Sequence, residues 1–331
     1  MRLIMMVSIL LASGVCWSAS KAEPPASSGN ETLELRPITF MCHWQPQAQF
    51  VGYYLAKEKG FYRRYGLDVT IKHAGTTVSN TEMLFQGKVQ FISTFLAAAI
   101  KLNGEKARMV NIAQLFRHSS LLIVARKNDG IKTVSDLNGR RVGVWYSDFE
   151  DIPLRFLESG GLRCHIVMIG GGVNMFLFGG VDAVNITSYN EFHSLLMAGV
   201  RPDSLTVFRM SENNLDIPED GIYCRKEYYE RNPDLCRDFA RASLEGWSYA
   251  AQHPEEALEL VERLLKEEHV SLARVHQRWM LREVLKLIFP PDVVGNAALT
   301  RENYLRTAEL LKSSGKIAGY VPFEEFYYGN Q

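Results

Sequence analysis

Short apolar runs alternate with stretches of helical periodicity along most of the chain. LDVTIKHAG (67–75) and VQFIST (89–94) have the length and the β-branched content of strands. TEMLFQGK (81–88) and FLAAAIKLNG (95–104) have helical spacing, and two further strands are predicted within 107–126. Strands that alternate with helices indicate an α/β fold with mostly parallel sheets and flanking helices.

The pattern of the first part of the chain returns later. GFYRRYGLDVTIKHAG (60–75) resembles RFLESGGLRCHIVMIGGG (155–172), and MLFQGKVQFISTF (83–95) resembles FLFGGVDAVNITSY (176–189). Each member of the first pair is a helix end, a Gly-Leu turn, a strand and a glycine stop. Two similar α/β units in one chain predict two lobes of like architecture.

Helical periodicity replaces this alternation after the second unit. A helical tail of that length has to pack on another part of the chain, and the first lobe is the nearest partner. We therefore expect lobe one to comprise 33–126 and 221–331, and lobe two to comprise 127–220. The two chain crossings would allow the lobes to close about a hinge. His269 and His276 lie seven positions apart in the tail, which predicts a solvated helix face.

The N-terminal residues differ from the rest of the chain. One basic residue, a short apolar run and then small residues are typical of a secretory signal peptide, which we place at 1–22. Residues 23–32 are rich in Pro, Ser and Gly and predict a flexible tether. Lipid attachment at Cys16 is the alternative. The mature protein is expected in the periplasm or otherwise exported, as a monomer.

Composition also limits which kinds of partner and bound group are expected. The 331 residues include 37 Lys and Arg against 37 Asp and Glu, so no basic surface for nucleic acid is expected. The cysteines beyond the signal form no C-x-x-C pair, and neither a metal site nor a cofactor is predicted. Cys224 and Cys236 either pair in an oxidising compartment or remain buried thiols.

Polar and aromatic residues follow four of the predicted strands. In open parallel sheets, ligands bind beyond the carboxyl ends of the strands. A heteroaromatic ligand would stack on aromatic rings there, and its N–H groups would donate to carboxylates. The predicted ligand-binding residues are Trp44, Gln45, Gln49, Thr94, Trp145, Tyr146, Ser147, Asp148, Thr187, Tyr189, Asn190 and Glu191.

Single members of this set also have simpler interpretations. Trp44 alone fits a packing residue, and Glu191 alone fits a solvated carboxylate in the first turn of a helix, where the helix dipole favours it. The recurrence at four equivalent loops favours binding. As a carboxylate in a cleft and not in a core, Glu191 is expected to contribute little to fold stability.

Four segments carry a family resemblance, namely HWQPQAQFVGYYLAKEKGFYRRYGLDV (43–69), GKVQFIST (87–94), VSDLNGRRVGVW (134–145) and SYNEFHSLLMAGV (188–200). They resemble the periplasmic substrate-binding family that includes importer receptors for thiamine pyrimidine precursors, and also the yeast thiamine pyrimidine synthases. The resemblance implies a type II periplasmic-binding-protein fold that closes over a small heteroaromatic, and the membrane permease of an ABC importer as partner. Related receptors take alkanesulfonates or flavins, so the ligand stays open.

The synthases are the enzymatic alternative. They are known to build the pyrimidine from their own histidine and pyridoxal phosphate, with a cysteine cluster that binds iron. The resemblance places their cofactor lysine near Thr94 and their sacrificed histidine near Ala98, and only Cys224 falls near the cluster. Thr and Ala can neither form the imine nor donate an imidazole, so we expect no enzyme activity. A ligand-sensing module for a separate signalling partner is the second alternative.

Overall fold

The described part of the chain contains both predicted α/β units. The computed structural model describes residues 34–75, 78–106, 108–146, 150–270, 273–291 and 297–329. The predicted signal peptide (1–22) and tether (23–32) lie outside these residues. The chain divides into Met1–Glu34 and Leu35–Gln331, and both sheets belong to the second unit.

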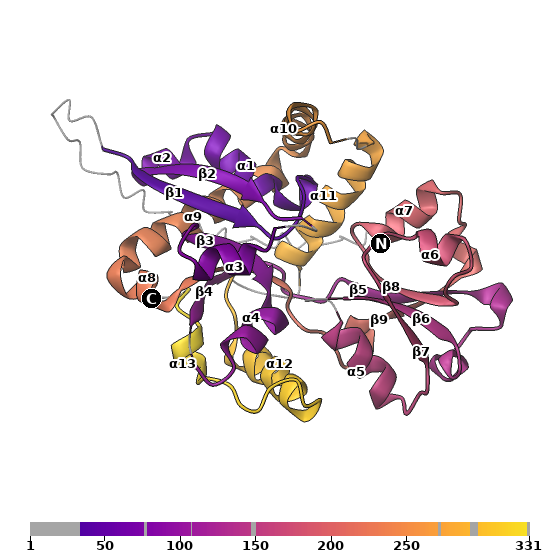
Figure 1. Cartoon of the computed structure of the whole chain (residues 1–331). Helices are drawn as coiled ribbons and strands as arrows, with labels where there is room; N and C mark the ends of the chain where they lie inside the picture. Colours follow the sequence, from indigo (N-terminus) through magenta and orange to yellow (C-terminus); the bar gives the residue numbers. More distant parts are fainter. Residues whose placement is uncertain are drawn as a thin grey trace, which may run out of the picture. The chain divides into compact units, whose positions relative to one another are not determined.

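Five strands form the first sheet, in the order β2-β1-β3-β10-β4 (Figure 1). β1 pairs in parallel with β2 and β3, whereas β10 runs antiparallel between β3 and β4. β3, in the middle of this order, and β4, at its end, are both buried along their whole length. The strands are β1 (Arg36–Cys42), β2 (Leu67–His73), β3 (Phe91–Phe95), β4 (Met109–Gln114) and β10 (Asp220–Arg225).

The second sheet repeats this arrangement, in the order β7-β6-β8-β5-β9. β6 pairs in parallel with β7 and β8, and β5 runs antiparallel between β8 and β9. The strands are β5 (Leu121–Arg126), β6 (Arg141–Trp145), β7 (His165–Ile169), β8 (Ala183–Thr187) and β9 (Leu205–Arg209). The echo in the sequence therefore corresponds to two sheets with equivalent strand order.

One strand differs from its predicted place. The sequence assigns residues up to 126 to lobe one, but β5 pairs with β8 and β9 of the second sheet. The chain therefore leaves the first sheet between β4 and β5, ahead of this strand. A continuous apolar run fits the centre of either sheet, so its composition alone does not say which one it enters. The two-sheet α/β fold itself is confirmed.

Helices flank both sheets. Residues 48–58 form a 3₁₀ turn and an α-helix that follows it directly. The α-helices are α1 (Val51–Glu58), α2 (Phe61–Arg64), α3 (Asn80–Phe85), α4 (Leu96–Asn103), α5 (Asp151–Ser159), α6 (Asn174–Leu177), α7 (Glu191–Met197), α8 (Lys226–Arg231), α9 (Pro233–Gln252), α10 (Pro254–Glu267), α11 (Arg274–Ile288), α12 (Arg301–Ser313) and α13 (Phe323–Phe326). The 3₁₀ helices are η1 (Ala48–Phe50), η2 (Lys127–Asp129), η3 (Val134–Leu137), η4 (Pro202–Ser204) and η5 (Met210–Glu212).

The helical tail packs on the first sheet's helices through a close crossing of α1 and α9. Two glycines make this approach possible. A Cβ atom on Gly246 would lie 2.0 Å from the carbonyl oxygen of Gly52, and a Cβ on Gly52 would lie 2.2 Å from the Trp247 ring. Trp247 is fully buried beside Phe40 and Phe239 in the same core. Glycine at these positions therefore allows α9 to pack closely on α1 and to cover the core of the first sheet.

α11 corrects the expectation for the tail histidines. His269 is exposed, but His276 is buried, because α11 packs against both η1 and α7. Gln277 binds η1 directly, since its Oε1 accepts from the Ala48 backbone N–H at 2.7 Å. The face of α11 around His276 is therefore a contact face.

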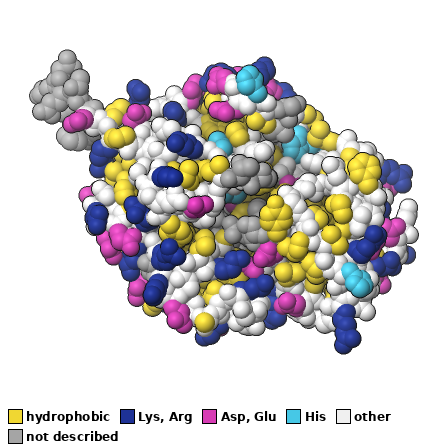
Figure 2. All heavy atoms as spheres, in the orientation of Figure 1, with side chains coloured by type: hydrophobic (Ala, Val, Ile, Leu, Met, Phe, Trp, Pro, Cys, Tyr) yellow, Lys and Arg dark blue, Asp and Glu magenta, His cyan; other side chains and the backbone are white. Residues whose placement is uncertain are grey.

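Acidic and basic side chains are interspersed over the face shown in Figure 2, in keeping with the equal numbers of the two kinds. Among the described helices, none is long and apolar enough to cross a membrane.

Candidate ligand-binding site

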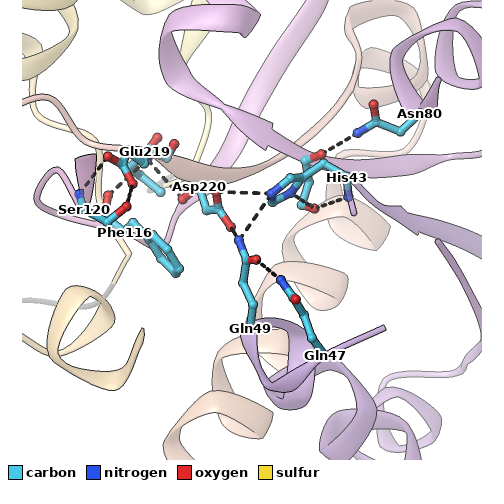
Figure 3. Close-up of polar contacts among 10 residues, drawn as sticks. His43, Gln47, Gln49, Asn80, Phe116, Ser120, Glu219 and Asp220 are labelled. Carbon is cyan, nitrogen blue, oxygen red and sulfur yellow. Dashed lines mark hydrogen bonds and ion pairs between the residues drawn. The ribbon is translucent and has the colours of Figure 1, made fainter. Parts of the chain in front are cut away.

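A cluster of buried polar side chains lies where β1, β3 and β10 meet at one edge of the first sheet (Figure 3). His43 directly follows β1, Ser93 is the middle residue of β3, and Asp220 begins β10. Because β10 is antiparallel to β3, its first residue reaches the edge at which β1 and β3 end. The His43 backbone N–H donates to Ser93 Oγ at 3.0 Å, and His43 Nδ1 lies 2.9 Å from the same oxygen.

The amides of the N-terminal motif belong to this cluster. Gln49 is 2% exposed, and its Nε2 donates to Asp220 Oδ2 at 2.9 Å. Gln47 Nε2 in turn donates to Gln49 Oε1 at 2.6 Å. His43 Nε2 lies 3.8 Å from Asp220 Oδ1, which has no hydrogen-bond partner among the described residues. One buried carboxyl oxygen therefore keeps bonding capacity at the strand ends.

Burial sets the charge of the two adjacent carboxyl groups. It raises the pKa of Asp220 to about 7, against the opposing effect of the Gln49 hydrogen bond. It raises the pKa of Glu219 to about 8, although Ser119 Oγ and Ser120 Oγ donate to that carboxyl group at 2.8 and 2.5 Å. Both groups therefore change charge near neutral pH, which is a common property of functional sites.

Ser93, His43 and Asp220 share residue types with a nucleophilic triad, but their geometry favours binding. The 3.8 Å separation between His43 Nε2 and Asp220 Oδ1 exceeds a hydrogen bond. Ser93 is 1% exposed, and its oxygen accepts from the backbone N–H of His43. A serine nucleophile needs access to its substrate and a base that a third group orients. Ser93 is buried and does not meet the first condition, and His43 Nε2 lies 3.3 Å from the neutral amide nitrogen of Gln49.

Aromatic rings from the two sheets meet beside these strand ends. Trp44, after β1, and Trp145, at the end of β6, have ring centroids 6.2 Å apart at an angle of 47°. Tyr189, after β8, is 2% exposed and contacts Phe116 edge to face. Tyr146 is 52% exposed. The structure thus brings together the rings of Trp44 and Trp145, which the sequence assigns to one binding site from different lobes.

Other predicted site residues are placed differently. Gln45 is exposed, and Ser147 and Asp148 lie outside the described residues. Thr94 is 1% exposed, and it faces Gly221 in the β3–β10 pairing, whereas Asp220 faces Phe95. Since successive residues of a strand point to opposite faces, Thr94 and Asp220 lie on different faces of the sheet.

The loop from Thr187 to Glu191 forms its own hydrogen-bond network. Glu191 is buried, and its carboxylate accepts from the Thr187 backbone N–H at 3.0 Å and from Thr187 Oγ1 at 2.7 Å. Asn190 Nδ2 also donates to it at 2.5 Å. Burial raises the pKa of Glu191, and the bonds from Thr187 oppose this. Glu191 is thus buried and bonded within its own loop, so in place of a small contribution to fold stability we now expect a substantial one.

Sequence reasoning left His43, Ser93, Glu219 and Asp220 out of the predicted site. His43 and Ser93 stand at strand ends in the sequence and could have been included by the same rule. Glu219 and Asp220 stand before β10, and only the antiparallel direction of that strand brings them to the binding edge. The direction of β10 is the signal that would have identified these two residues, and the sequence pattern does not reveal it.

A cavity of about 520 Å³ lies elsewhere, between α1, β2 and α10. Tyr54 and His73 line it, and the Tyr54 hydroxyl lies 3.0 Å from His73 Nε2. His73 Nδ1 lies 2.8 Å from the Trp44 carbonyl oxygen, and burial lowers the pKa of His73 to about 4. These buried polar groups bind each other, so the strand-end cluster, with its open carboxyl oxygen, is the better ligand site.

Metal and thiol chemistry has little support in the described residues. No group of three or more His, Cys, Asp or Glu side chains there is arranged to hold a metal ion. The Cys224 and Cys236 sulfur atoms lie 4.0 Å apart, and both thiols are free.

Comparisons with known proteins agree with this architecture. A family model described as NMT1/THI5 like matches residues 47–257. The riboflavin-binding protein RibY of Chloroflexus aurantiacus is 22% identical, over 94% of this chain and 89% of its own. A formylaminopyrimidine-binding protein of Halalkalibacterium halodurans is 22% identical over 79% of each chain. The 4-amino-5-hydroxymethyl-2-methylpyrimidine phosphate synthase THI13 of Saccharomyces cerevisiae is 25% identical, over 66% of this chain and 68% of its own.

Solved structures identify the fold. The periplasmic aliphatic sulphonate binding protein SsuA from Escherichia coli is similar with a TM-score of 0.67 at 18% identity, covering 88% of this chain and 96% of that chain. The fold is thus that of the periplasmic binding proteins, as the sequence resemblance implies. Since the family model spans more than half of the sequence, the chain belongs to the NMT1/THI5 like family.

Proposed function

We propose that this protein is the exported ligand-binding component of an ABC importer and captures a small heteroaromatic, of the thiamine pyrimidine precursor class, between its two lobes. The observation that carries the proposal is the meeting of Trp44 and Trp145 from different sheets beside a buried polar cluster. Such a pair can hold a flat ring only when both lobes contribute. The names of two relatives, which specify riboflavin and formylaminopyrimidine, support a flat nitrogen heterocycle.

Binding would use two kinds of contact. The ring would stack on Trp44 and Trp145, which must separate to admit it. An amino or ring N–H group would donate to Asp220 Oδ1, the buried oxygen that lacks a hydrogen-bond partner among the described residues. Ligand contacts from both lobes would shift the population toward the closed state, and a membrane permease would receive the ligand-loaded protein.

The synthase alternative is disfavoured by the residues at its required positions. Thr94 and Ala98 are buried and carry neither an amine nor an imidazole. Purified protein incubated with pyridoxal phosphate and iron should therefore yield no pyrimidine product and lose no histidine by mass. Single-turnover formation of either would overturn the receptor proposal.

The direct test is titration calorimetry of the purified protein with aminopyrimidines, riboflavin and alkanesulfonates, preceded by mass spectrometry of any copurified ligand. The proposal expects saturable binding of a nitrogen heterocycle and none of an aliphatic sulfonate. Binding of the sulfonate alone would refute the ligand class.

A further inference from the structure

α11 contacts the predicted ligand loop of the second sheet through two histidines and a tryptophan. His276 of α11 and His193 of α7 stack with ring centroids 5.2 Å apart, and their Nδ1 atoms lie 2.9 Å from each other. His276 Nε2 lies 3.0 Å from Asn190 Oδ1. Trp279 Nε1 donates to the Ser188 carbonyl oxygen at 3.1 Å, and its ring stacks on His193. The contacts join the C-terminal tail to residues 188–193.

The hydrogen bonds fix where the protons lie. The Glu191 carboxylate accepts from Asn190 Nδ2, so Asn190 Oδ1 must accept from His276 Nε2–H. A neutral His276 then has an unprotonated Nδ1, which can accept from His193 Nδ1–H. The pair therefore holds a single proton between its two Nδ1 atoms, and the His276 ring is neutral.

From this geometry we infer that His276, His193 and Trp279 form a clamp that positions the 188–191 loop for ligand, and that the clamp weakens when His276 takes up a proton. This inference rests on the proposed function, because it treats the loop with Tyr189 and Asn190 as part of the ligand site. The three clamp residues act through the loop and are positioning residues.

The surroundings oppose a positive charge on either ring. A proton added to His276 Nδ1 would face the proton on His193 Nδ1 at a separation of 2.9 Å. The Arg282 guanidinium lies 4.6 Å from the centre of the Trp279 ring. Burial, and secondarily the charge of Arg282, lowers the pKa of His193. Cation–π attraction between Trp279 and a charged His193 would therefore have to compete with Arg282.

Other charged groups near α11 are already paired. On α10, Glu255 and Glu262 bind Arg274, and Glu255 also binds Arg278. On α7, Glu191 reaches the pair only through Asn190. η1 contributes the neutral residues 48–50 to the contact with α11. No carboxylate among these described elements thus makes a direct ion pair with either histidine.

The pH range follows from His276. Burial, and secondarily the charge of His193, lowers the pKa of His276 from 6.5 to about 4. A released histidine therefore takes up a proton below about pH 6.5, while the clamped one stays neutral down to about pH 4. The clamped state is fully favoured above pH 6.5 and loses its advantage as the pH falls from 6.5 toward 4. At pH 5, the loss from His276 alone reaches at most about 30-fold.

The test compares the full-length mature parent with His276→Gln at pH 7.5 and pH 5.0. Hydrogen exchange of the 186–198 region is measured without ligand and corrected for the intrinsic effect of pH. Dissociation constants for the bound heterocycle are measured at both values. Gln keeps a donor and an acceptor but does not titrate. The parent should lose about 5- to 30-fold more affinity at pH 5.0 than the variant, and protection of 186–198 should fall with pH only in the parent.

Controls separate the clamp from folding and from the proposed function. His165→Gln, at an exposed position of β7, should retain the pH response of the parent. If His276→Gln fails to fold, His193→Asn serves in its place: it keeps His276 buried but removes the second contribution to its lowered pKa, so the pH response should become smaller. An equal pH dependence of exchange in the parent and both clamp variants would overturn the inference. A parent that binds no heterocycle refutes the proposed function, whereas exchange in the unliganded protein still decides the clamp.

Discussion

Replacing Asp220 with Asn should stabilise the protein at alkaline pH while weakening ligand binding. The substitution keeps the shape of the side chain and removes its charge. The remaining oxygen can still accept from Gln49 Nε2, as Asp220 Oδ2 does at 2.9 Å. The variant therefore isolates what the buried negative charge costs the fold and what it contributes to the site.

The magnitude follows from the pKa of Asp220. Burial raises it from 3.8 to about 7, so the folded state holds a proton that the unfolded state has released between these values. Stability therefore falls as the pH rises from about 4 to about 7 and then levels off, at a total cost of about 4 kcal/mol. Since local water and relaxation reduce such costs, Asp220→Asn should gain about 1–4 kcal/mol over the parent at pH 8.

Binding should change in the opposite direction. A charge-assisted hydrogen bond is roughly twice as strong as a neutral one, so losing the charge should cost about 1–2 kcal/mol, or about 5- to 30-fold in the dissociation constant at pH 8. Residues of functional sites often improve ligand affinity at a cost in fold stability, and Asp220 is expected to do both.

Urea unfolding at pH 5.5 and 8.0, with calorimetric titration at pH 8.0, measures both effects. Asp68→Asn, at an exposed position of β2, is the matched control and should change neither quantity by more than about 0.5 kcal/mol. The reasoning fails if Asp220→Asn is less stable than the parent at pH 8.0 and binds ligand equally well. Asp220 would then be a structural acceptor.

Three further substitutions test the structure. Trp44→Ala removes a half-buried ring that contacts the second sheet, so ligand affinity should fall by about 1–3 kcal/mol in calorimetry; unchanged affinity would make Trp44 a packing residue. Glu191→Gln sets an amide N–H against one of the loop's donors and should cost about 1–3 kcal/mol in urea unfolding, while no loss would contradict the network. Gly246→Ala should cost at least about 2 kcal/mol, and Gly75→Ala, which has open space, should not.

The sequence correctly predicts that the rings of Trp44 and Trp145 come together, because strand ends obey a simple rule. Trp44 follows β1 and Trp145 ends β6, and parallel strands place their carboxyl ends at one edge. The repeated α/β pattern likewise predicts two similar sheets, and the structure has them. Periodicity and local order therefore suffice wherever neighbouring strands run in the same direction.

The remainder depends on contacts between distant segments. Whether 121–126 enters the first or the second sheet is decided by pairing with β8 and β9, and the apolar run itself is compatible with both. His276 lies on a helix rich in charged residues, and the packing of α11 against η1 and α7 buries it. Asp220 reaches the binding edge because β10 is antiparallel. Such facts are properties of the assembled fold and leave no periodic signal in the sequence.

The two antiparallel strands, β5 and β10, also explain why buried carboxyl groups lie beside the connections between the two sheets. The chain crosses from the first sheet to the second before β5 and returns before β10, so the two crossings lie next to the strands that reverse direction. Glu219, in the return crossing, accepts from Ser119 and Ser120 in the outgoing one. Asp220, the next residue, accepts from Gln49 at the strand-end cluster. Burial, and to a smaller extent the charge of Asp220, raises the pKa of Glu219, so a proton that binds Asp220 also changes the electrostatic environment of the crossing.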